Sequence, residues 1–318
     1  MTDRDTVDSM EPAAVSARFF HLSGLPVARR RDLAPASFES IDAQLAGCTV
    51  EELRRLRAGF QASAAQAARE LAARPTVAQA LEALVLPVGA TLVAFGDSIT
   101  EDSLSWATQL AHLLADARPD LQARVVNAGV TGHTTLEAIC RFDLVAREEP
   151  AYVIQLLGTN DARRHGAAGV TTTSPAETRR NLTVLRDLVA QETPAQHLVL
   201  TPPPVIEEWA NSWGPFRDEG IGWHAQDVVD VAATIRNLHP DAVDVHAVIA
   251  ELGPRSLLLP DGVHPSLHGQ SVIAELVLHA LAGLPSRTGP AVSTSTVGAP
   301  PAVAPHPDST ARRPSTAG

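Results

Sequence analysis

The stretch TLVAFGDS, residues 91–98, joins a short apolar run to a Gly-Asp-Ser turn, and it decides the fold of this chain. Residues 91–95 favour a strand, and a helical pattern begins a few residues after Gly96. Four further strand-like runs follow, at 124–127, 152–157, 197–201 and 242–245. The helical patterns between and after them lie at 103–116, 134–147, 175–191, 224–238 and 266–283. Strands that alternate with helices predict an α/β fold with a five-stranded parallel sheet covered on both faces.

The two ends of the chain differ from this β-α region. Residues 1–88 show helical spacing in their second half, and Thr49 followed by Glu52 is typical of a capped helix start. We therefore predict a helical extension over 1–88 packed on a main domain over 89–284, with an independent regulatory domain as the alternative. Residues 285–318 are rich in Pro, Ser, Thr and Ala without a hydrophobic stripe, which predicts a disordered tail.

The charge and composition of the chain limit its partners. The formal net charge is −11 over 318 residues, whereas a protein that binds nucleic acid needs a basic face. We therefore expect neither nucleic acid nor an anionic membrane surface as a partner. Residues 1–12 lack the basic start and apolar run of a secretory signal, and no apolar stretch reaches membrane-spanning length. These features predict a cytoplasmic protein without membrane insertion, and none of them indicates its oligomeric state.

Cys48 and Cys140 are the two cysteines of the chain. Neither belongs to a C-x-x-C pair or stands at metal-ligand spacing from a histidine, so no metal or redox site is expected. We predict two buried thiols, with a disulfide between them as the alternative.

Ser98 follows directly on a predicted strand and precedes a predicted helix. Parallel α/β sheets carry their sites at the carboxyl ends of strands, and helix N-terminal N–H groups favour negative charge there. Ser98 is therefore a candidate nucleophile, although a serine that only caps the helix has the same local sequence. The neighbouring Asp97 is expected to brace the turn by accepting backbone hydrogen bonds.

The stretch Asp261-Gly262-Val263-His264 offers a base for that serine. A serine hydroxyl is a poor nucleophile until a base takes its proton, which a histidine does near neutral pH. The other ring nitrogen needs a carboxylate, and a three-residue spacing on a turn can bring Asp261 to His264. The alternative is a surface turn with a capping aspartate.

Gly132 and Asn160 are the remaining candidate site residues, because both follow predicted strands as Ser98 does. Acyl transfer develops an oxyanion that needs hydrogen-bond donors already in place. The backbone N–H groups of Ser98 and Gly132 and the side-chain amide of Asn160 are the natural donors. Taken singly, Gly132 is also typical of a loop, and Asn160 of a turn.

Four blocks of this chain resemble the SGNH hydrolase superfamily, the GDSL-type esterases and lipases. The matching blocks are Gly96-Asp97-Ser98-Ile99-Thr100, 127–134, Gly158-Thr159-Asn160-Asp161 and 261–265. The resemblance implies a three-layer α/β/α sandwich with a central five-stranded parallel sheet, the flavodoxin-like fold of SGNH hydrolases. It also implies a catalytic triad of Ser98, Asp261 and His264, an oxyanion hole of Ser98, Gly132 and Asn160, and no cofactor. The helical stretch before the first block departs from the family and leaves substrate class and partners open.

Two further segments are candidates for substrate contact. Residues 205–223 follow the fourth predicted strand and are expected to wall an acyl pocket, with a surface loop as the alternative. The candidate pocket residues in this segment are Trp209, Trp213, Phe216 and Trp223. Residues 163–165, Arg-Arg-His, are expected to form a solvated loop, with contact to an anionic or carbohydrate substrate as the alternative.

The sequence thus predicts a serine esterase that hydrolyses carboxylic esters through an acyl-enzyme, with small or acetyl-type acyl groups. One alternative is an acyltransferase that passes the acyl group to an alcohol or amine in a biosynthetic pathway. The other is a non-catalytic, partner-binding protein with a vestigial site. The expected partner is a small-molecule ester, whose acyl length and alcohol part no motif indicates.

Overall fold

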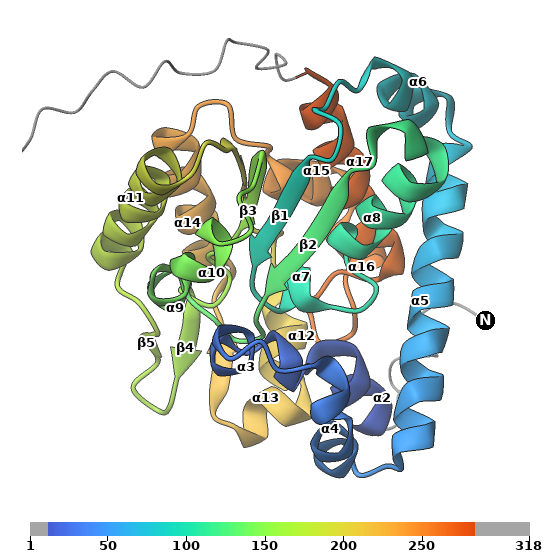
Figure 1. Ribbon diagram of the computed structural model, residues 1–318. Helices are drawn as coiled ribbons and strands as arrows, with labels where there is room; N and C mark the ends of the chain where they lie inside the picture. The colour runs from blue at the N-terminus through green and yellow to red at the C-terminus, as the bar shows by residue number, and fades with distance from the viewer. Residues whose placement is uncertain (1–11, 284–318) are drawn as a thin grey trace, which may run out of the picture. The chain divides into compact units, whose positions relative to one another are not determined.

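The computed structural model describes residues 12–283, and its main sheet has four parallel strands in the order β2-β1-β3-β6 (Figure 1). The strands are β1 (Thr91–Gly96), β2 (Arg124–Gly129), β3 (Tyr152–Leu156) and β6 (Gln196–Leu200). Both neighbours of β1 pair with it in parallel, so that Leu92 lies opposite Val125 on β2 and Tyr152 on β3. The predicted α/β fold with a parallel sheet is therefore confirmed, as are its first four strands.

The predicted fifth strand, 242–245, is wrong, because only Val243 pairs with the sheet. Val243 forms a single parallel bridge to Leu200. The next residue, Asp244, already caps helix α15 (Val245–Leu252) by accepting a hydrogen bond from Ala247 N at 3.2 Å. A chain that enters a helix after one paired residue cannot extend a ladder, so the sheet consists of four strands and this bridge.

Helices cover both faces of the sheet, because the side chains of β1 alternate between the faces. Leu92 and Ala94 pack in one core with α8 (Trp106–Ala117), α15 and α17 (Leu267–Gly283). Val93 and Phe95 pack in a second core with α9 (Thr135–Cys140), α10 (Phe142–Ala146) and α11 (Pro175–Glu192). Helix α14 (Ala225–Leu238) packs beside α11 (Figure 1). A strand that is apolar at successive positions is what a sheet buried on both faces requires.

The single helix predicted over 134–147 is wrong, since two short helices, α9 and α10, meet at Arg141. The buried Arg141 guanidinium donates hydrogen bonds to Ala128 O at 2.6 Å and to Gly96 O at 2.7 Å. Both carbonyls lie at the carboxyl ends of strands, on β2 and β1. Arg141 therefore ties this part of the chain to the strand ends from which the site loops leave.

In the described part of the chain before β1, residues 12–83 are mainly helical. The α-helices are α2 (Pro12–Phe19), α3 (Pro26–Arg30), α4 (Glu39–Ala46), α5 (Val50–Ala72) and α6 (Pro75–Ala83), with 3-10 turns at Leu22–Gly24 and Pro35–Ser37. The predicted helix start at Thr49 is confirmed, because its side chain accepts from Glu52 N and the Glu52 carboxylate accepts from Thr49 N. Leu71 of α5 and Leu81 of α6 belong to the same core as Leu92, on the face of the sheet that α8 and α17 cover.

The domain bounds predicted at 88/89 and 284/285 stay predictions. The tail predicted over 285–318, and most of the segment read for a secretory signal, lie outside the described residues. Over residues 12–283, no helix is both long enough and apolar enough to span a membrane.

The segment 205–223 contains α12 (Glu207–Ser212), α13 (Gly214–Asp218) and β7 (Ile221–Trp223). Strand β7 pairs antiparallel with β4 (Arg163–His165), which also pairs with β5 (Val170–Thr171). The solvated loop predicted over 163–165 is therefore wrong, because these residues form the middle strand of a second, three-stranded sheet. Residues 163–165 are ordered by backbone pairing with β7, which lies far along the chain. A local sequence pattern does not predict pairing of this kind.

Both cysteines are free thiols. Cys140 is exposed and Cys48 is partly exposed, so the prediction of two buried thiols is wrong. Cys140 is the last residue of α9, which buries Thr135 and Ala138 instead.

Candidate active site

Ser98 is the first residue of the short helix α7 (Ser98–Glu101), which only Asp97 separates from the end of β1. Asp97 caps this helix, and its Oδ1 accepts a hydrogen bond from Ile99 N at 3.0 Å. The predicted bracing of the turn by Asp97 is thus confirmed. Because α7 starts at the carboxyl end of an interior strand, Ser98 lies where parallel α/β folds carry their sites.

His264 lies between Ser98 and Asp261. Its Nε2 is 2.9 Å from Ser98 Oγ, and its Nδ1 is 2.7 Å from Asp261 Oδ2. A carboxylate accepts hydrogen bonds, so the ring proton belongs on Nδ1 and leaves Nε2 as the acceptor for the serine hydroxyl. The structure therefore brings these three predicted residues together in a hydrogen-bonded relay.

Gly262 gives this relay its tight turn. It has φ +70°, and a Cβ there would lie 2.6 Å from Ile206 O, at the base of α12. Inside the turn, Asp261 Oδ1 accepts from Val263 N at 2.8 Å and from His264 N at 2.9 Å. Both carboxylate oxygens of Asp261 are thus held, which fixes the carboxylate relative to the imidazole.

The charges of the His264–Asp261 pair stabilise each other. Burial alone would lower the pKa of His264, but the negative charge of Asp261 and its hydrogen bond outweigh burial, and the pKa is raised above its usual 6.5. Burial alone would raise the pKa of Asp261, but the His264 charge and the hydrogen bonds to Asp261 lower it below its usual value. The site therefore favours an ionised carboxylate beside a basic imidazole.

Asp97 behaves differently from Asp261. It is fully buried, and burial raises its pKa to about 6 despite the hydrogen bond from Ile99 N. Its Oδ2 has no hydrogen-bond partner among residues 12–283. Among residues 12–283, Asp97 forms no hydrogen bond with the side chain of Ser98 or His264, and its charge reaches His264 only through space. Its direct contribution is therefore to the turn rather than to proton transfer.

Gly132 and Asn160 line the same cavity as Ser98 and His264. Gly132 has φ +80°, a conformation that favours glycine. The Asn160 amide donates from Nδ2 to His133 O at 3.2 Å, and its Oδ1 accepts from Arg163 Nη1 at 3.3 Å. The Asn160 side chain is therefore held at both ends beside the loop that carries Gly132.

The cavity around Ser98 has a volume of about 380 Å³. Three of the four predicted pocket aromatics line it, namely Trp213, Phe216 and Trp223. Trp223 is nearly buried and donates from Nε1 to Thr159 O at 2.9 Å, which joins it to the block that carries Asn160. The fourth, Trp209, does not line the cavity, because its ring lies under the Arg255 guanidinium at 5.1 Å.

Arg163 also lines this cavity, although the sequence analysis placed it in a solvated loop. Its Nε donates to His165 Nε2 at 3.2 Å, and no carboxylate among residues 12–283 lies within ion-pair distance of it. Partial burial lowers the pKa of Arg163 from its usual value. The only sequence signal for it is its position three residues after Asn160.

Part of the cavity comes from the start of the chain, where the sequence analysis identified no element. Val15, Phe19 and Phe20 line it, and the Phe19 ring lies 4.7 Å from the His264 ring. Nothing in the local sequence distinguishes these residues from ordinary helix core. Only their tertiary contacts show that they belong to the site.

The arrangement is suited to acyl transfer through Ser98 by proton transfer to His264. Over residues 12–283, no group of three or more His, Cys, Asp or Glu side chains is placed to hold a metal ion.

The chain matches a family of known proteins. The GDSL-like Lipase/Acylhydrolase family model matches residues 94–272, more than half of the chain. An acetylxylan esterase of Geobacillus stearothermophilus is 26% identical over 211 residues, which are 61% of this chain and 94% of that protein.

Two solved structures share the fold. A catalytic mutant of the acetylxylan esterase Axe2 from Geobacillus stearothermophilus has a TM-score of 0.50 at 20% identity, covering 62% of this chain and 95% of its own. LAE5, an alpha/beta hydrolase from the metagenome of Lake Arreo in Spain, has a TM-score of 0.50 at 24% identity. The match covers 63% of this chain and 99% of LAE5. At these identities the likeness concerns the fold alone. With the match of the family model, the chain belongs to the GDSL-like lipase/acylhydrolase family, the SGNH hydrolases, which act on ester bonds.

Proposed function

We propose that this protein is a serine esterase that hydrolyses carboxylic esters with Ser98 as its nucleophile. The observation that carries the proposal is the relay from Ser98 Oγ to His264 Nε2 at 2.9 Å and from His264 Nδ1 to Asp261 Oδ2 at 2.7 Å. A vestigial site in a partner-binding protein has no need of this geometry.

In the first half of the reaction, Ser98 Oγ attacks the acyl carbonyl while its proton moves to His264 Nε2. The carbonyl oxygen becomes an oxyanion, for which the N–H groups of Ser98 and Gly132 and the Asn160 amide are the proposed donors. The tetrahedral intermediate then collapses to the acyl-enzyme. The proton on His264 Nε2 passes to the leaving alcohol as the ester C–O bond breaks.

In the second half, a water molecule replaces the alcohol. His264 takes a proton from this water, whose oxygen attacks the acyl carbon of the acyl-enzyme. Collapse of the second intermediate releases the carboxylic acid and returns the proton to Ser98 Oγ. Asp261 stays ionised throughout and holds the imidazole, consistent with its lowered pKa.

We propose a small, acetyl-type acyl group as the substrate's acid part. The support is the acetylxylan esterase relative, at 26% identity over nearly the whole of that protein. An acetyl group fills little of a cavity of about 380 Å³, so much of the remaining volume is available to the alcohol part of the ester.

The first test compares Ser98→Ala with the wild type on p-nitrophenyl acetate and with a fluorophosphonate probe. We expect the wild type to turn over the ester and to be labelled at Ser98, and the variant to lose both. Ser63→Ala is the matched control, because Ser63 is an exposed serine on α5. Undiminished turnover in Ser98→Ala would refute the assignment of the nucleophile.

The same assay separates hydrolysis from transfer. Candidate alcohols and amines are added to the reaction, and the products are analysed by mass spectrometry. Free acid as the dominant product supports the esterase, whereas an acylated acceptor formed in preference to acid would make the protein an acyltransferase.

A further inference from the structure

Residues 15–21, which we call the N-terminal arm, are hydrogen-bonded to two loops of the candidate site. Arg18 O accepts from Ser103 N at 3.0 Å, and the backbone N–H of His21 donates to Glu101 Oε1 at 3.2 Å. Phe19 O accepts from the Thr131 hydroxyl, next to Gly132. The arm thus touches both the segment after Ser98 and the loop that carries Gly132.

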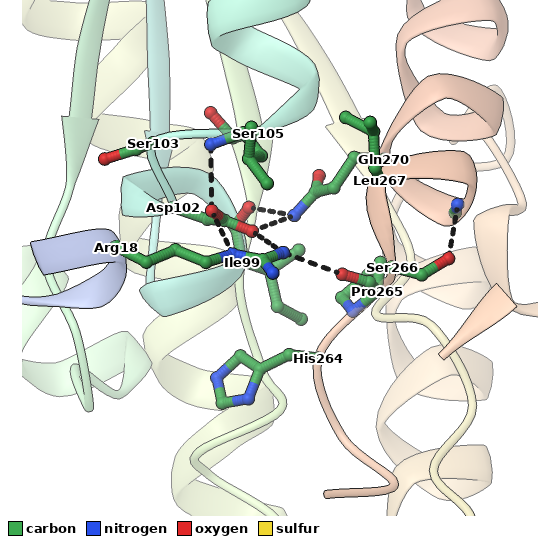
Figure 2. Close-up of polar contacts among 12 residues, drawn as sticks. Arg18, Ile99, Asp102, Ser103, Ser105, His264, Pro265, Ser266, Leu267 and Gln270 are labelled. Atoms are coloured by element: carbon green, nitrogen blue, oxygen red, sulfur yellow. Dashed lines mark hydrogen bonds and ion pairs between the residues drawn. The ribbon is translucent and has the colours of Figure 1, made fainter. Parts of the chain in front are cut away.

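A buried ion pair holds the arm in place. Arg18 donates to both carboxylate oxygens of Asp102, from Nε to Oδ1 and from Nη2 to Oδ2, each at 2.8 Å (Figure 2). The two residues are only 4% and 0% exposed. Among residues 12–283, Arg18 is the only basic side chain within 4.0 Å of Asp102. Moving the arm away would leave a buried carboxylate without a cation, which is strongly unfavourable.

The Arg18–Asp102 ion pair, which we call the clamp, also contacts the loop that carries His264. Asp102 also accepts from Leu104 N at 2.8 Å. It accepts from the Gln270 amide as well, at 3.2 Å (Figure 2). Arg18 Nη2 lies 3.5 Å from Pro265 O, the carbonyl directly after His264. The clamp is therefore connected to the third site loop as well, and the arm is a fixed part of the site rather than a lid.

The side chains beside this clamp face the substrate cavity. Phe19 is 6% exposed, and its ring centroid lies 4.9 Å from the Arg18 guanidinium and 4.7 Å from the centroid of the His264 ring. Phe20 lines the same cavity and is 55% exposed, as expected for a residue at its mouth. Phe216 of α13 also lies near His264, with the ring centroids 6.5 Å apart. The cavity thus has aromatic walls from two segments far apart in the chain.

We propose that the N-terminal arm is a permanent wall of the substrate pocket, and that Phe19 and Phe20 limit the size of ester the pocket accepts. Arg18 is a positioning residue that holds this wall through Asp102. The family match begins at residue 94, so this determinant of specificity lies outside the matched region. The inference rests on the proposed esterase function of Ser98.

The test measures kcat/KM for p-nitrophenyl acetate, butanoate and octanoate in the wild type, Phe19→Ala and Phe20→Ala. Removing an aromatic wall enlarges the pocket, so we expect the octanoate-to-acetate ratio to rise about tenfold in each variant. Leu45→Ala is the matched control, because Leu45 is a 68% exposed residue of α4 that does not line the cavity. Ratios within twofold of the wild type in both folded phenylalanine variants would overturn the proposal.

The clamp is tested with Arg18→Met and Arg18→Lys on the same esters. Arg18→Met frees the wall and should raise KM and the octanoate-to-acetate ratio, whereas Arg18→Lys keeps the charge and should restore part of the wild-type profile. If Arg18→Met does not fold, the double variant Arg18→Met/Asp102→Asn removes the unpaired buried charge and takes its place. A folded variant without the clamp that keeps the wild-type ratio would show that Arg18 does not hold the wall.

These outcomes are separable from failure of the proposed function. Wild-type turnover of p-nitrophenyl acetate and fluorophosphonate labelling of Ser98 test the nucleophile alone. An active, labelled wild type whose chain-length profile is unaffected by the arm variants keeps the esterase and rejects the arm.

Discussion

The His264–Asp261 contact is local, and the contact of His264 with Ser98 is not. His264 lies three positions after Asp261, and the turn at Gly262 brings their side chains together. Ser98 meets His264 only because its own turn and the histidine loop lie at the same end of the sheet. A pairwise motif therefore predicts half of the relay, and the fold supplies the other half.

Asn160 offers a sharp test of the oxyanion donors. Asn160→Ala should lower kcat on p-nitrophenyl acetate by about 10²–10³ with little change in KM, because the lost donor acts in the transition state. Asn237→Ala is the control, since Asn237 is exposed on α14. A loss of less than about threefold would mean that Asn160 serves the loop around His133 and not the reaction.

The His264–Asp261 pair predicts the pH dependence of the reaction. His264 acts as a base only when neutral, so kcat/KM should rise with pH through its pKa, which lies above 6.5. Asp261→Asn removes the charge that raises this pKa and leaves burial, which lowers it. We expect the acid limb of the profile to move to lower pH and kcat to fall about 10³–10⁴-fold. An acid limb that stays in place would contradict the pairing.

At the scale of elements, replacing glycine by alanine should have opposite effects on stability in the turn at Gly262 and in the middle of helix α5. Gly262→Ala forces a side chain onto φ +70° and against Ile206 O, so it should lower stability by about 2–4 kcal/mol. Gly59→Ala places alanine in an exposed helix position with nothing within 4 Å, so it should raise stability by about 0.5–1 kcal/mol. Urea unfolding of both variants checks the two signs, and equal signs would contradict this interpretation.

The elements with strong local patterns are those that the sequence predicted. Strands β1, β2, β3 and β6 are apolar runs bounded by turn residues, and α5 begins with a reciprocal Thr49–Glu52 cap. The elements that it missed depend on distant partners. Strand β4 forms because β7 pairs with it. The apolar run at 242–245 does not form a strand, because Asp244 caps the start of helix α15.

At the scale of the molecule, the packed pair of His197 and His239 links folding to pH. His197 packs 5.5 Å from His239, both of its ring nitrogens lack hydrogen-bond partners among the described residues, and burial lowers its pKa to about 3. Between that value and 6.5 the unfolded chain binds a proton that the folded chain does not, so stability falls as the pH is lowered through this window.

The corresponding variant is His197→Phe, which keeps an aromatic ring and removes the titrating group. Between pH 7.5 and pH 5, the wild type should lose about 1–2 kcal/mol more of its unfolding free energy than the variant. Urea unfolding at the two pH values measures the difference, with the exposed His268→Phe as control. Identical pH dependence in wild type and His197→Phe would show that the pair does not carry this linkage.

The sequence alone determined the fold class, the family resemblance and the identity of Ser98, Asp261, His264, Gly132 and Asn160 as site candidates. These follow from short-range patterns, because strand runs, turns and three-residue spacings are read within a few positions. The sequence also indicated three of the aromatic residues that line the cavity, but only the tertiary structure decided the rest of its wall. It placed Arg163, Val15, Phe19 and Phe20 there, left Trp209 outside, and held the arm with the Arg18–Asp102 pair. The physical reason is that a pocket wall is set by packing and buried charge between segments far apart in the chain, which no local pattern encodes.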